Sequence, residues 1–128
     1  MDIEGLSGRE LDVAIARQVF GLQVEELAIA RTGQKDFVYA LRPEAPNGEW
    51  VRVPFYSISL AASIQVELEL QKRGWKRHEV QAGSHWKEPG GLRVILEHAD
   101  GRTVGAFGSE NEALCRAALE ALESLPGA

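Results

Sequence analysis

The sequence predicts an α+β fold, a three-layer α/β/α sandwich in which three helices surround an antiparallel-rich sheet of about four to six strands. Helix and strand patterns follow one another in the order α-β-β-(β)-α-β-β-β-α, in which the strand in parentheses could instead be an extended segment. Strands 37–41 and 94–96 are apolar on both faces, which indicates helices on both sides of the sheet. The 128 residues, 45% of them apolar, fit one domain with an ordered core over about 7–125.

The first half of the chain predicts one helix, two strands and a third segment that is a short strand or extended. Ser7 and Glu10 form the S-x-x-E pattern of a capping box, in which each side chain bonds the other residue's free backbone N–H. Apolar residues then recur at helical spacing, which predicts a helix over 8–21 that ends at Gly21. Segments rich in apolar residues and bounded by turn residues predict strands over 24–31 and 37–41 and a short strand or extended segment over 50–53.

The second half predicts two helices on either side of a strand and a hairpin. A helix is expected to begin at Ser57 or Ser59, both good N-cap residues, and to end near Arg73 before Gly74. Asp-Gly at 100–101 lies between two apolar runs, the strongest short signal for a β-hairpin. The expected elements are strands over 75–80, 92–97 and 102–107 and a helix over 110–124, which Ser109 and Glu112 cap.

The second helix carries two apolar stripes instead of one. Leu60, Ala61, Ile64 and Leu68 fall within about 100° of the helical wheel. The roughly opposite stripe, which we predict to be a protein interface or a homodimer contact, contains Ala62, Val66 and Leu70. The competing interpretation is that this stripe packs against the first helix within one chain.

Charge and cysteine content restrict the class of protein. The net charge of −5 argues against a general nucleic-acid binder, whose surface is usually basic. A single cysteine, Cys115, excludes an intramolecular disulfide and suggests a reducing compartment. Its place on the apolar side of the last helix predicts a buried residue. Without an apolar run of about 20 residues or a signal peptide, we expect a cytoplasmic protein with no membrane contact.

A basic and aromatic cluster is the alternative candidate site. It contains Lys72, Arg73, Trp75, Lys76 and Arg77, and such side chains suit a nucleotide or another small anionic ligand. The glycine-rich segment 105–109 precedes a helix and could place backbone N–H groups on a phosphate. Each feature also has a purely structural interpretation. The basic residues would complement the negative C-terminal end of a helix, and Gly105 would let a helix approach the strand closely.

No catalytic or metal-binding constellation is recognisable. His78, His85 and His98 are separated by seven and thirteen residues and form no compact zinc pattern with Cys115. Asp, Glu, His and Ser residues do not group along the chain. We therefore expect no metal, no cofactor and no enzymatic activity.

Three segments resemble the phage ABA-sandwich domain family. Residues 10–22 (ELDVAIARQVFGL) resemble its ELDxxIAxxVMGW opening, 54–62 (PFYSISLAA) its PxYSTDxxAA helix start, and 113–119 its ALCRAAL helix. Departures are Phe20 for Met, Leu22 for Trp and Ser59 for Asp, and each keeps size class or capping ability. The resemblance spans most of 8–124.

The resemblance implies a small phage- or prophage-encoded α/β/α domain and carries no catalytic residues. The function expected from it and from the two-striped helices is a non-enzymatic protein-interaction or host-modulating module in the cytoplasm of a bacterial host. The alternative is a protein that binds or sequesters a small ligand or nucleotide through the cluster around Trp75.

Overall fold

The computed structural model describes residues 3, 5–28, 35–40, 50–82 and 92–124, which form three helices and six strands. Every element lies within a few residues of its expected position, and the α+β class is confirmed. In chain order the elements are α1 (Gly8–Gln18), β1 (Val24–Ala28), β2 (Lys35–Ala40), β3 (Trp50–Arg52), α2 (Leu60–Lys72), β4 (Trp75–Ala82), β5 (Leu92–His98), β6 (Thr103–Gly108) and α3 (Glu110–Glu123).

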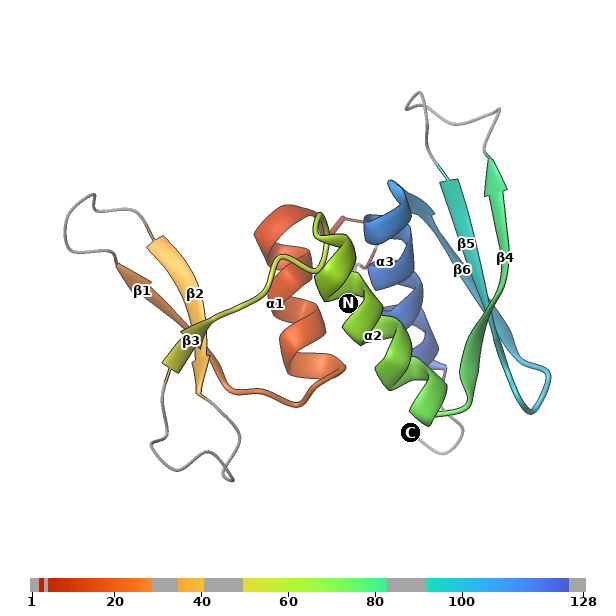
Figure 1. The fold of residues 1–128 in the computed structure, drawn as a ribbon, viewed down its shortest axis with the longest axis horizontal. Helices are drawn as coiled ribbons and strands as arrows, with labels where there is room; N and C mark the ends of the chain where they lie inside the picture. Colours follow the sequence, from red (N-terminus) through yellow and green to blue (C-terminus); the bar gives the residue numbers. More distant parts are fainter. Residues whose placement is uncertain (1–2, 4, 29–34, 41–49, 83–91, 125–128) are drawn as a thin grey trace.

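The six strands form two antiparallel sheets, and the expectation of one sheet is wrong. One sheet has the order β1-β2-β3 and the other β4-β5-β6. The three helices lie between the two sheets (Figure 1). The expected hairpin is present: Glu97 pairs with Thr103, and Gly101 takes a φ of 96° in the turn. Local turn chemistry thus specifies hairpins, while the joining of hairpins into one sheet depends on contacts far apart in sequence.

Among the described residues, helices cover only one face of the β4-β5-β6 sheet. Val94 and Leu96 point toward α3 and are fully buried. The opposite face carries polar side chains, with His78 Nδ1 3.2 Å from a carboxylate oxygen of Glu97. Ile95, the apolar residue between the two buried ones, is half-buried. The three-layer sandwich is therefore not confirmed, and the side chains of 37–41 lie outside the described residues.

α3 is the centre of the core, and the small side chains on it explain why. It packs on β5 and β6 on one side and against α1 and α2 on the other. Small residues let backbones approach closely on several sides of one helix. The small buried residues of α3 are Ala113, Cys115, Ala117, Ala118 and Ala121.

The helix N-termini follow the expected capping residues in two cases of three. Ser59 begins α2 and accepts the backbone N–H of Ala62, and Ser109 and Glu112 form the reciprocal capping box of α3. Ser7 is the N-cap of α1, but its side chain makes no capping hydrogen bond, so the first expected capping box is wrong.

Candidate interaction surface

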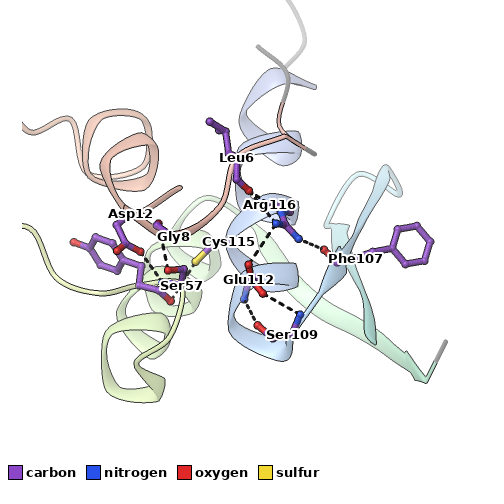
Figure 2. Close-up of polar contacts among 10 residues, drawn as sticks. Leu6, Gly8, Asp12, Ser57, Phe107, Ser109, Glu112, Cys115 and Arg116 are labelled. Atoms are coloured by element: carbon purple, nitrogen blue, oxygen red, sulfur yellow. Dashed lines mark hydrogen bonds and ion pairs between the residues drawn. The ribbon is translucent and has the colours of Figure 1, made fainter. Parts of the chain in front are cut away.

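A buried polar cluster fixes the segment that leads into α2. Asp12 on α1 is fully buried, and its Oδ1 accepts the backbone N–H of Ser57 at 2.8 Å (Figure 2). Its Oδ2 accepts a guanidinium N–H of Arg9, which also donates to the carbonyl of Val53 at 2.8 Å. These contacts join residues about 45 positions apart. Sequence reasoning missed Asp12, whose only signal was a carboxylate within an apolar helical pattern.

The inner face of α2 is core, which corrects the predicted interface. Val66 is fully buried and Leu70 is 1% exposed within the single chain. Ala62 is half-buried and packs against the same core. These side chains are covered because α2 packs on α3, whose alanines leave room for them. A partner therefore has no access to Val66 or Leu70 in the folded chain.

The outer face of α2 carries the apolar stripe that the fold leaves exposed. Ile58 is 71% exposed, Leu60 65%, Ile64 44% and Leu68 46%, and we call these four residues the α2 stripe. Phe55, 37% exposed, lies under the Arg9 guanidinium at 4.1 Å. Most large apolar side chains that are exposed in the described residues thus lie between 55 and 68.

A groove lies beside the C-terminal half of the α2 stripe. Its volume is about 550 Å³, and it is partly open to solvent. The floor combines apolar and polar side chains from the end of α1 and from α2: Phe20, Gln65, Leu68, Glu69, Gln71 and Lys72. The apolar stripe and this groove therefore share Leu68 and form one continuous surface.

The side chains of the basic and aromatic cluster do not come together as one ligand site in the structure. Trp75 is only 1% exposed, and Arg73 donates to the carbonyl of Val19 at 2.6 Å. Arg77 is ion-paired with Glu67 at 3.1 Å and also with Glu110. Lys72 and Lys76 remain at the surface. The structure separates these neighbours because a helix end and a strand point successive side chains in different directions.

The glycine-rich segment does not form an anion site either. The Ser109 hydroxyl accepts the backbone N–H of Glu112, the Glu112 carboxylate accepts the backbone N–H of Ser109, and Glu110 and Glu112 place negative charge at this helix end. Both features disfavour a phosphate. Gly105 does not make room for a helix, since a Cβ there would lie 3.1 Å from Nε of Arg93, a side chain of the neighbouring strand.

Cys115 and His98 both bond backbone carbonyl groups of neighbouring segments. Cys115 is fully buried, and its Sγ donates to the carbonyl of Tyr56 at 3.4 Å. Burial, reinforced by the charges of Asp12 and Glu112, raises the pKa of the Cys115 thiol well above its usual value. His98 Nε2 donates to the carbonyl of Arg73 at 3.0 Å.

Two further observations concern metal and membrane. Within the ranges that the structure describes, no group of three or more His, Cys, Asp or Glu side chains could hold a metal ion. His85 lies outside these ranges. None of the helices in the described part of the chain is both long and apolar enough to cross a membrane.

Comparisons of the chain with protein-family models, with curated proteins and with solved structures find no match. The resemblance of the three segments to the phage ABA-sandwich family therefore stays a prediction.

Proposed function

We propose that the protein is a non-enzymatic interaction module that binds a protein partner through the α2 stripe. The observation that carries the proposal is the exposure of four large apolar side chains along one face of α2 and the turn before it. Contiguous apolar surface of this kind on a soluble domain is characteristic of an interaction site.

The contacts of the other candidate groups support this choice. Asp12, Cys115 and Arg73 each bond a backbone group of a neighbouring segment, so their polar atoms already serve the fold. Arg77 is ion-paired with Glu67. The α2 stripe, in contrast, lies outside the hydrophobic core of the described residues and is between 44% and 71% exposed. The small-ligand alternative around Trp75 loses its main support, because that ring is buried.

The remaining expectations are kept as proposals. A phage or prophage origin and a host-modulating role rest on the family resemblance. A three-layer α/β/α order and a cytoplasmic location rest on the sequence patterns described above. That order would need a helical layer over the outer face of β4-β5-β6.

Photocrosslinking in cells of the source organism tests the proposed function. A photoreactive amino acid replaces Ala61, which is exposed beside the α2 stripe, or Thr103, which is exposed on β6 and serves as the matched control. We expect a protein adduct from position 61 and none from 103, and we expect Ile64→Glu to abolish it. Equal adducts at both positions, or none at 61, would contradict the proposal.

A further inference from the structure

We propose that the partner of the α2 stripe is the α2 stripe of a second copy of this chain, packed antiparallel about a twofold axis near Ile64. This inference depends on the proposed function, because it names the partner of the same surface. A twofold interface uses one patch on both copies, so the patch must be complementary to itself. Three properties of the surface meet that requirement: residue spacing, the position of the groove, and charge.

The spacing places Ile64 at the centre of a symmetric ridge. Leu60 and Leu68 lie four residues before and after it, about 6 Å away on either side along the helix axis. In an antiparallel pair, Leu60 therefore lies opposite the partner's Leu68, and Ile64 lies opposite its own equivalent. Ridges of this i±4 type interdigitate in the commonest class of helix packing.

The groove and the most exposed apolar side chain lie at opposite ends of the surface. Ile58, 71% exposed, precedes the N-terminus of α2, whereas the groove beside Leu68 lies toward its C-terminus. An antiparallel arrangement brings each Ile58 toward the groove of the other copy. A parallel arrangement would instead place Ile58 against the partner's Ile58 and leave the two grooves facing each other. The surface thus favours the antiparallel orientation.

Charge does not oppose this contact, although the chain carries a net charge of −5. Gln65 and Gln71, on the same exposed side of α2, are neutral. The carboxylates of Glu67 and Glu69 are ion-paired with arginines of their own chain, at 3.1 and 3.5 Å. Lys72, whose side chain is 77% exposed, lines the groove near the end of the helix and lies 3.7 Å from a carboxylate oxygen of Glu69. Two copies can therefore meet without stacking like charges.

The apolar area agrees with a weak dimer. The four residues of the α2 stripe are between 44% and 71% exposed, which corresponds to an apolar area on the order of several hundred Å² per copy. Stable interfaces bury about 800 Å² per partner, which is more than the stripe alone exposes. We therefore expect the stripe to form the centre of the interface and the groove with its polar neighbours to form the rim. We expect a dissociation constant on the order of micromolar.

Sedimentation of the purified full chain tests self-association. We expect the mass to rise from 14.0 kDa toward twice that value between about 1 and 200 µM. Ile64→Glu should remain a folded monomer throughout, because it places two like charges at the axis. Val80→Glu changes a residue of comparable exposure, 39%, on β4 and should leave the dimer intact. Circular dichroism establishes that both variants fold.

Disulfide trapping tests the orientation. Leu60→Cys mixed with Leu68→Cys should form a crosslinked heterodimer on mild oxidation, while Leu60→Cys alone should not crosslink to itself. Native Cys115 is fully buried and does not interfere. Self-crosslinking of Leu60→Cys without the mixed product would overturn the antiparallel arrangement.

The outcomes separate this inference from the proposed function. A monomer at all concentrations, together with an adduct of a different protein from position 61 in cells, refutes the homodimer and keeps the interaction module. The absence of any adduct from position 61 refutes the interaction module itself.

Discussion

Asp12 is expected to be the polar residue whose loss most weakens the fold. The Asp12→Ala variant leaves the buried N–H of Ser57 without its acceptor, which costs about 1–3 kcal/mol. It also removes the ion pair with Arg9, whose side chain is 25% exposed and keeps its bond to the carbonyl of Val53, so this loss adds about 1 kcal/mol or less. Together the free energy of unfolding should fall by about 1–4 kcal/mol.

Urea unfolding followed by circular dichroism measures this change. With a denaturant slope of about 2 kcal/mol/M, the midpoint should fall by about 0.5–2 M urea. Asp12→Asn keeps an acceptor oxygen for Ser57 and should lose only about 1 kcal/mol. Glu10→Ala, on the same helix but exposed, is the control and should change stability by less than about 0.5 kcal/mol. If Asp12→Ala behaves like Glu10→Ala, the buried cluster does not hold α1 to the segment before α2.

Three further perturbations have defined outcomes. Cys115→Ser should destabilise the chain by about 1–3 kcal/mol in urea unfolding, because it places a hydroxyl in the core. Native Cys115 should react with a thiol reagent only as fast as the protein opens, and rapid labelling would contradict its burial. Gly74→Ala should lower the thermal midpoint, because φ is +89° and the new Cβ would lie 2.8 Å from His98 Nε2; an unchanged midpoint would be the contrary result. The pKa of Asp100 is lowered, chiefly by the backbone N–H of Arg102, so its ionised form stabilises the hairpin. Wild type should therefore exceed Asp100→Asn in stability at neutral pH, and the difference should vanish as pH falls through the folded-state pKa; a difference that persists in acid would exclude this cause.

Local signals predicted the elements well, since caps, turns and apolar spacing act over a few residues. The capping residues Ser59 and Ser109 and the Asp-Gly turn at 100–101 are all found where the sequence indicates. The division of the strands into two sheets was not predictable in this way, because pairing between hairpins is decided by contacts distant in sequence.

The candidate surface was predicted to lie on α2 but on the wrong face. The two stripes are similarly apolar, so the sequence of α2 alone does not determine which of them is buried. That depends on which element packs against the helix. The stripe with Val66 and Leu70 fits the small residues of α3 and is buried, so Ile64 and its neighbours remain outside. The prediction of a ligand site in the basic cluster was wrong for a related reason. Residues from Lys72 to Arg77 are close in sequence, but their side chains point in different directions.

The central place of α3 has a consequence for how the chain is made. α1 leaves the ribosome about 100 residues before its main packing partner, a delay of roughly 5–20 s at ordinary rates of synthesis. During that delay the apolar side chains of α1 that are buried in the folded chain, such as Leu11 and Ile15, have no α3 to cover them. Arg116 then joins the first and last described segments, since its guanidinium bonds the carbonyl of Leu6, 110 residues away (Figure 2). Translation speed and chaperone supply should therefore affect the yield of folded protein more than the ordinary composition of the chain suggests.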